Sequence, residues 1–315
     1  MRRLLFIFIF SLSALNLGAR IPDSDSNPLR DELVFLTDSL CGGRATGSPG
    51  CQNAAFFLLR SFKSSGLNTF VQSFDCSGNV GHNIIGITPG WYRRYIVIGA
   101  YYDGLGTLGG ELYPGADSNA SAVAALLELT RMLPSLCKRE VGVIFVAFDA
   151  HNVGLQGSKA FLDRYYGKCR IDLMVNLDIL GSVEVPLHKN RPDYLIALGG
   201  ASHVFSMDNA NRGIGLDLGF DYYGSSNFTE LFYRKVSDQR WFLEKGIPSV
   251  MFTSGITMRT NKTADTVGSL DLDMLGRRIS FISRWISYLL YHPSHIFCKF
   301  AELMKIHNSN KYGKS

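Results

Sequence analysis

The 315-residue sequence contains no CxxC pair, no GxSxG motif and no run of basic residues interleaved with aromatic side chains. The first absence argues against a zinc–thiolate site, and the second argues against the nucleophile elbow of serine hydrolases. The third, together with a net charge of only +5, argues against nucleic-acid binding. What remains, with 46% hydrophobic residues, suits a globular protein with one large α/β domain or two small ones.

Long hydrophobic runs are missing as well. The apolar run at residues 4–12 is too short for the roughly 20 residues of a membrane span, and no later segment reaches that length. The run follows two arginines and precedes small residues that end at Ala19, which is the order of a secretory signal peptide rather than of a membrane anchor. We therefore predict a signal peptide at 1–19, a flexible lead-in at 20–28, a single domain at 29–315 and a secreted or periplasmic protein without a stable transmembrane segment.

Cysteine is neither rare nor clustered. An even count of six in an exported protein allows disulfides, and Cys41 and Cys51 bracket the loop "CGGRATGSPGC". We expect these two to be the best candidate pair, although spacing alone does not fix the connectivity.

Continuous apolar runs of strand length alternate with helical patterns. Strands are predicted at 94–100, 141–148, 171–180, 193–200 and 246–254, and helices at 31–40, 52–66, 119–133, 154–166 and 272–292. Strands without polar alternation, separated by helices, predict a mainly parallel sheet covered on both faces. In such sheets the functional residues gather at the carboxyl ends of the strands. Here those ends carry "YYDG" (101–104), "DAHNVG" (149–154) and "LDILGS" (177–182), beside the loop "YPGADSNAS" (113–121).

Together these loops resemble the co-catalytic zinc aminopeptidase family, which includes secreted leucyl aminopeptidases, glutamate carboxypeptidase and glutaminyl cyclase. The family pattern reads GAHxD, PGADDNASG, FxxxxEExGLxGS, NLDMxG and HTxxDT. The chain has, in the same order, "GAYYDG", "PGADSNASA", "FVAFDAHNVGLQGS", "NLDILGS" and "TNKTADT", and "SDQRWFLEKGIPSVMF" is similar to a further family stretch. The resemblance implies a zinc-exopeptidase-like, three-layer αβα fold with a central mixed, mainly parallel twisted sheet.

The resemblance also implies a site that this chain has altered. The family holds two zinc ions with a His, a bridging Asp, a Glu, a second Asp and a second His, and a separate Glu takes the proton of the bridging water. The five ligand positions correspond to Tyr101, Ser118, Asn152, Asp178 and Asn261, and the base position to His151. Tyr, Ser and Asn are poor zinc ligands near neutral pH, so only Asp178 is retained. Asp103, which in the family orients the first His, is kept.

Two functions follow as alternatives. The first is a pseudopeptidase that needs no zinc and has kept a scaffold for a peptide or protein in the former active-site cleft, with no nucleic acid as partner. The second is an active metal-dependent aminopeptidase, hydrolase or acyl-transfer enzyme with an atypical site around His151, Asp178, Asp103 and Asp117, with zinc bound if the site has been rebuilt. A register slip of one residue would bring Asp117 to the bridging position. His151, with an unperturbed pKa of about 6.5, suits a general base, or it is a polar loop residue that fills the vacated volume.

Overall fold

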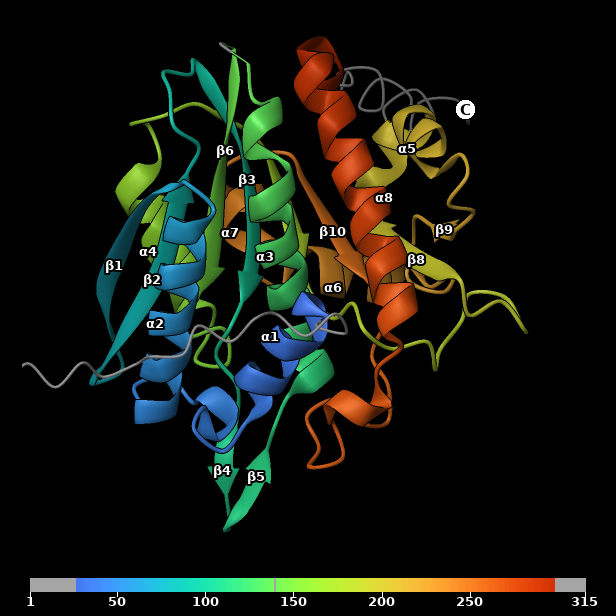
Figure 1. Cartoon of the computed structure of the whole chain (residues 1–315). Coiled ribbons are helices and arrows are strands. Elements are labelled where there is room, and N and C mark those ends of the chain that lie inside the picture. Colours follow the sequence, from blue (N-terminus) through green and yellow to red (C-terminus); the bar gives the residue numbers. More distant parts are fainter. Residues whose placement is uncertain (1–26, 139, 298–315) are drawn as a thin grey trace, which may run out of the picture.

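The computed structural model describes residues 27–138 and 140–297, so the predicted signal peptide at 1–19, residues 20–26 of the lead-in and Cys298 lie outside the described residues. Figure 1 labels the elements. The helices are α1 (Pro28–Thr37), α2 (Pro49–Ser64), α3 (Ala122–Met132), α4 (Gln156–Tyr165), α5 (Val204–Asn211), α6 (Ser226–Arg234), α7 (Gln239–Glu244) and α8 (Leu272–Tyr291). The strands are β1 (Asn68–Cys76), β2 (Asn79–Ile87), β3 (Arg94–Tyr101), β4 (Gly106–Leu108), β5 (Glu111–Tyr113), β6 (Val141–Phe148), β7 (Ile171–Leu177), β8 (Tyr194–Leu198), β9 (Asp217–Gly219) and β10 (Ser249–Thr253).

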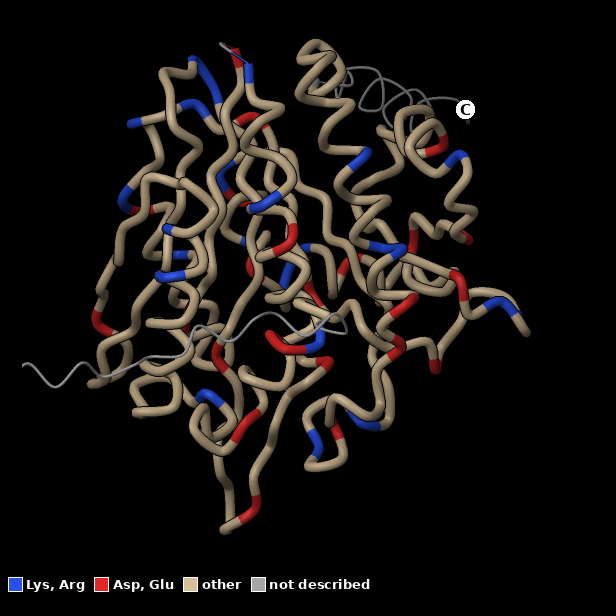
Figure 2. Tube along the Cα trace, viewed as in Figure 1, with Lys and Arg blue, Asp and Glu red and all other residues tan. Residues whose placement is uncertain are grey.

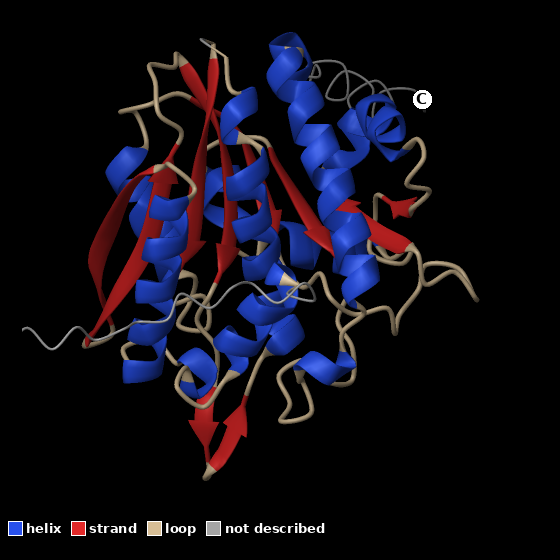
Figure 3. Ribbon diagram, in the orientation of Figure 1, coloured by secondary structure: helices blue, strands red, loops and turns tan. Residues whose placement is uncertain are grey.

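An eight-stranded mixed sheet, in the order β1-β2-β6-β3-β7-β10-β8-β9, forms the centre of the structure. Its four central strands, β6, β3, β7 and β10, are mutually parallel. Strand β2 runs antiparallel to both β1 and β6, whereas β8 runs antiparallel to β10 and parallel to β9. Helices cover both faces of the sheet (Figure 3). The predicted α/β architecture with a mixed, mainly parallel sheet is therefore confirmed.

The two faces of the sheet have separate cores because successive strand side chains point in opposite directions. Along β3, Ile96 and Ile98 pack in the cluster that contains buried residues of α1, α2, α3, α5 and α8, whereas Val97 packs in the cluster with α4 and α7. Every residue of β6 is buried, as expected of a strand covered on both sides. None of the described helices combines the length and apolarity that a bilayer span requires.

Two local expectations are wrong. The helix predicted from residue 119 begins at Ala122, after an irregular turn over 116–121. The side chain of Asn119 links two strand ends instead: its amide nitrogen lies 3.2 Å from the carbonyl oxygens of Tyr101 and Leu177, and its oxygen accepts a hydrogen bond from the amide of Ile179. These hydrogen bonds of the Asn119 side chain are favoured because the buried backbone groups that they satisfy have no water to bond.

The second concerns the cysteines. Cys41 and Cys51 are both buried free thiols, so the expected disulfide is absent. Cys51 lies in the first turn of α2, and its sulfur is 3.6 Å from a carboxylate oxygen of Asp149. Burial raises the pKa of this thiol well above its usual range. Both cysteines act as small residues of the core that also contains buried side chains of α1 and α2.

Candidate functional site

Three of the predicted ligand positions form one hydrogen-bonded chain at the carboxyl edge of the sheet. Tyr101 ends β3, and its phenol oxygen lies 3.2 Å from the Ser118 hydroxyl. That hydroxyl lies 3.3 Å from the side-chain oxygen of Asn261. The Asp265 carboxylate brings the loops together, because it accepts hydrogen bonds from the backbone amides of Asp117 and Ser118 at 2.7 and 3.0 Å. Side chains 160 residues apart in sequence number are thereby joined through direct contacts.

His151 lies against this chain. Its ring stacks on Tyr101 with 3.6 Å between ring centroids, and its Nδ1 lies 2.8 Å from a carboxylate oxygen of Asp238. Burial by itself lowers the pKa of His151, but the carboxylates of Asp238, Asp178 and Asp103 outweigh it and raise the pKa to about 9. The imidazole is therefore protonated at neutral pH and paired with Asp238, whose side chain is fully buried.

Asp178 follows β7 and is nearly buried. One of its carboxylate oxygens accepts a hydrogen bond of 2.5 Å from the Ser237 hydroxyl. Burial raises the pKa of Asp178, while the nearby His151 and the Ser237 hydroxyl oppose that rise. Asp178, the residue predicted to be the retained ligand, thus already accepts a hydrogen bond on one oxygen from a protein donor.

The side chains of Asp103 and Asn152 form hydrogen bonds within the turn after β6 and do not belong to the stack of Tyr101 and His151. The fully buried Asp103 carboxylate accepts hydrogen bonds from the backbone amides of His151 and Asn152, at 2.8 and 3.0 Å, and from the Asn152 side chain at 3.1 Å. Burial raises the pKa of Asp103 to about 6. Asn152 therefore turns its amide nitrogen toward Asp103, and its role is to hold the turn.

Asp117 lies on the other side of the Ser118 peptide. One carboxylate oxygen accepts hydrogen bonds from the Gly181 amide at 2.7 Å and the Ser121 hydroxyl at 3.2 Å. Its second oxygen is buried without a hydrogen-bond partner among the described residues. Burial raises the pKa of Asp117 to about 7. The side chain is used to fix the loop after β7 against the turn at 116–121.

This donor set does not fit the two zinc ions of the family. No group of three or more His, Cys, Asp and Glu side chains in ranges 27–138 and 140–297 is arranged to hold a metal ion. The phenol of Tyr101, the hydroxyl of Ser118 and the amides of Asn152 and Asn261 are weak donors for zinc, and burial raises the pKa of Tyr101 further above its usual range. Instead, Tyr101, Ser118 and Asn261 form hydrogen bonds with one another, and the Asn152 side chain bonds Asp103.

Three residues of the site were missed by the sequence reasoning. Asp238 and Ser237 begin the stretch "SDQRWFLEKGIPSVMF", and Asp265 belongs to "TNKTADT". Both stretches resemble family motifs, but the resemblance does not indicate a role for these three residues. The resemblance of these stretches to family motifs is the sequence signal that could have found the three residues. Only their contacts with His151, Asp178 and Ser118 reveal what the side chains do.

The pair of His151 and Asp238 predicts a pH dependence of stability. The pKa of about 9 in the folded state exceeds the value of about 6.5 expected in the unfolded chain, so the folded state binds the proton more tightly. The stabilisation is fully present below about pH 6.5 and is lost as the pH rises through about 9, with an upper limit of about 3 kcal/mol. Urea unfolding at a series of pH values measures it, and a doubly substituted chain, His151→Gln with Asp238→Asn, should show a flatter profile above pH 7. An equal loss in both proteins would contradict the assignment.

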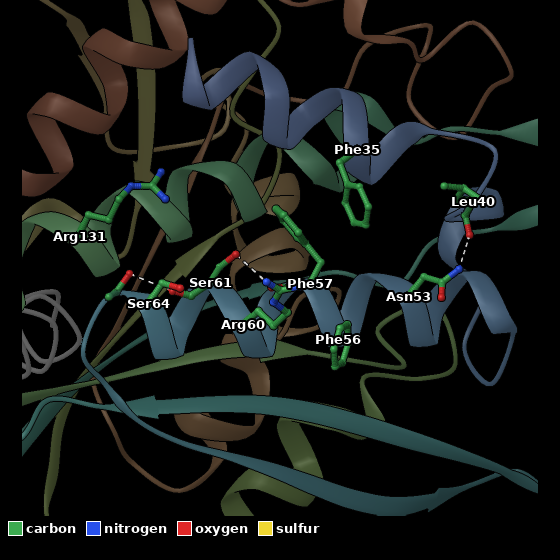
Figure 4. A pocket seen from close by; sticks show the side chains of 10 residues that line it. Phe35, Leu40, Asn53, Phe56, Phe57, Arg60, Ser61, Ser64 and Arg131 are labelled. Carbon is green, nitrogen blue, oxygen red and sulfur yellow. Dashed lines mark hydrogen bonds between the residues drawn. The ribbon is translucent and has the colours of Figure 1, made fainter. Parts of the chain in front are cut away.

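A separate groove lies on the outer helical layer, between α1 and α2 (Figure 4). Its volume is about 710 Å³, and none of the predicted site residues lines it. Phe35 of α1 and Phe57 of α2 form its aromatic floor, with 4.4 Å between ring centroids, and Arg60 lies over the ring of Phe56. The groove is therefore distinct from the edge where the predicted site residues gather.

Comparison with known proteins identifies a peptidase family and individual relatives that this chain resembles. The sequence matches the profile of peptidase family M28 over residues 83–286, which is more than half of the chain. The uncharacterized protein YfbL of Escherichia coli K12 is 24% identical over 249 residues, covering 71% of this chain and 75% of YfbL. Aminopeptidase YwaD of Bacillus subtilis is 29% identical over 233 residues, covering 72% of this chain and 46% of YwaD. The chain thus spans about half the length of that aminopeptidase.

Solved structures show the same fold. BSAP, a zinc aminopeptidase from Bacillus subtilis, superimposes with a TM-score of 0.66 at 15% sequence identity, covering 82% of this chain and 93% of BSAP. At this identity the similarity concerns the fold, including the mixed sheet flanked by helices.

Proposed function

Because the chain belongs to peptidase family M28, we propose that it is a member that has lost the dinuclear zinc site and the peptidase activity and has kept the scaffold to bind a peptide or another protein. The observation that carries this proposal is the direct bonding of the replaced positions. Ser118 contacts both Tyr101 and Asn261, so three former ligand positions are joined to one another. Two zinc ions would need imidazole nitrogens and carboxylate oxygens at these positions, all directed at a shared space.

The retained carboxylates support the same conclusion. Asp103 is held by the turn at His151 and Asn152, Asp117 by the Gly181 amide and Asp178 by the Ser237 hydroxyl. Each has a protein partner that takes part of its hydrogen-bonding capacity. Asp178 alone lies at a former ligand position, and a single carboxylate does not compensate two divalent charges.

A second candidate is an enzyme that uses His151 as a general base, and the Asp238 carboxylate at Nδ1 favours it by orienting the ring. A base must be unprotonated to accept a proton, and the pKa of about 9 leaves only about one imidazole in a hundred neutral at pH 7. The Ser118 hydroxyl forms its hydrogen bonds with Tyr101 and Asn261, and none with His151 among the described residues. The pseudopeptidase is the better supported function.

The deciding experiment measures metal and turnover together. The purified protein is dialysed against zinc and analysed for bound metal, and a panel of aminoacyl substrates is assayed with and without chelator, beside an active zinc aminopeptidase as control. We expect substoichiometric zinc and no turnover that the chelator abolishes. Stoichiometric zinc with chelator-sensitive hydrolysis would overturn the proposal, and turnover that survives the chelator would favour the His151 site.

Two further proposals concern the whole chain. We propose that residues 1–19 direct export and that residues 29–315 form a single domain. The first is supported by the order of arginines, apolar run and small residues. The second is supported by the eight-stranded sheet, which draws its strands from residues 68 to 253.

A further inference from the structure

The edge of the sheet opposite the candidate site is where its four parallel strands begin. Arg94 of β3 aligns with Val141 of β6, Tyr95 aligns with Ile171 of β7, and β10 begins opposite Met174. The described residues of the loops before these strands, at 88–93, 134–138, 166–170 and 245–248, therefore come to the same edge. We call it the basic edge and define it by the exposed residues Trp91, Arg93, Lys138, Tyr166, Lys168 and Lys245.

Aromatic side chains on the basic edge are unusually open to solvent. Trp91 is 97% exposed, and Tyr166 is 51% exposed. Tyr291, from the end of α8, lies next to this edge and is 49% exposed. Lysines lie over the two tyrosine rings, with Lys245 Nζ 5.3 Å from the Tyr166 centroid and Lys138 Nζ 4.2 Å from the Tyr291 centroid. A tryptophan left in water forgoes the free energy of burial, which is a reason to look for a surface that covers it.

The exposed charged residues that define the basic edge are all cationic. Arg93, Lys138, Lys168 and Lys245 are exposed, and none forms an ion pair with a carboxylate among the described residues. Acidic side chains also occur in or beside these loops, and they are paired: Glu140 and Asp172 bond Arg94, and Arg170 also bonds Asp172. Glu244, which precedes Lys245, bonds Arg240. Figure 2 shows the blue segments gathered at the upper end of the sheet, where β3 and β6 begin.

We propose that the basic edge docks on an anionic lipid bilayer, with Trp91 inserted at the interface. Tryptophan and tyrosine favour the headgroup region, because one part of the ring system is apolar and another part is polar. Lysine and arginine beside them are attracted to the negative surface potential of anionic lipids. In this orientation the site at the carboxyl ends of the strands faces away from the bilayer and stays open to the solvent. The proposal is independent of whether the site binds zinc or a peptide.

The test uses the tryptophan fluorescence of the purified protein with vesicles of phosphatidylcholine, with or without phosphatidylglycerol. Of the three tryptophans, Trp285 is fully buried and the indole of Trp241 donates a hydrogen bond to the Leu155 carbonyl, so insertion acts on Trp91. We expect a blue shift and quenching by brominated lipid only with anionic vesicles. Both signals should disappear in Trp91→Ala.

Charge reversal supplies the matched control. Lys168→Glu with Lys245→Glu should weaken vesicle co-sedimentation at least about tenfold. Lys189→Glu with Lys262→Glu carries the same charge change on exposed loops away from the basic edge and should bind like the parent protein. Circular dichroism confirms that each variant is folded. Equal binding by both double variants would overturn the proposal, as would binding without any response of Trp91. Binding to a DNA duplex without binding to anionic vesicles would assign the edge to nucleic acid and would also overturn it.

Discussion

Restoring the family's residues at the altered positions is expected to convert the chain into one that binds about two zinc ions. The substitutions are Tyr101→His, Ser118→Asp, His151→Glu, Asn152→Glu and Asn261→His. They supply two imidazoles and two ligand carboxylates beside Asp178, and they remove the phenol and hydroxyl that now bond one another. Elemental analysis after dialysis against zinc measures the change, which should run from substoichiometric to about two ions per chain.

The control keeps every restored residue and adds Asp178→Asn. Because we predict Asp178 to be the one ligand that the chain has retained, this sixth change should remove much of the gained zinc while the fold is preserved. A parent protein that already binds as much zinc as the restored chain would contradict the loss of the site. A restored chain that is folded and metal-free would show that the register of the loops, and not only their residue types, has changed.

A large loss of stability is expected from Arg44→Met. Arg44 is fully buried, and its guanidinium donates hydrogen bonds to the carbonyl oxygens of Leu36, Tyr102, Pro114 and Gly115. Methionine fills a similar length but donates nothing, so four carbonyls in three segments lose their partner. We expect a cost of about 3–5 kcal/mol and a melting temperature lower by roughly 10 °C.

Two variants sharpen this measurement. Arg60→Met removes a solvent-exposed arginine from α2 and should change the free energy of unfolding by less than about 0.5 kcal/mol. Arg44→Lys keeps a charge but loses the planar fork, so it should fall between the parent and Arg44→Met. Melting followed by circular dichroism orders the three. Equal melting temperatures for Arg44→Met and Arg60→Met would show that the hydrogen bonds from the Arg44 guanidinium to the four carbonyls do not stabilise the fold.

Arg44 also shows the limit of reasoning from local sequence. The stretch "GGRATG" reads as a glycine-rich turn. It is a turn, but the side chain of its arginine points into the core. There it donates hydrogen bonds to carbonyl oxygens of the segment before Ser118, about 70 residues away in the chain. Nothing in the residues beside Arg44 indicates a buried guanidinium, because burial depends on the segments that close over it.

The fold class, the loops at the strand ends and the residue types at the predicted ligand positions could all be read from the amino-acid sequence. Apolar runs without alternation indicate parallel strands, and ordered motifs identify which loop follows which strand. These are local properties, so they can be read without coordinates. The prediction that Tyr101 stands where the family has a His, and Asn152 where it has a Glu, likewise rests on the order of the motifs along the chain.

Only the tertiary structure decided what those residues do. His151 bonds Asp238, which lies 87 positions away, and Asp103 bonds the amide of His151 across 48 positions. A buried polar group takes whichever partner the fold brings within about 3 Å, since no water is there to replace it. The order of the strands in the sheet determines which of these residues come into contact. For that reason the hydrogen bonds that join Tyr101, Ser118 and Asn261 become visible only in three dimensions.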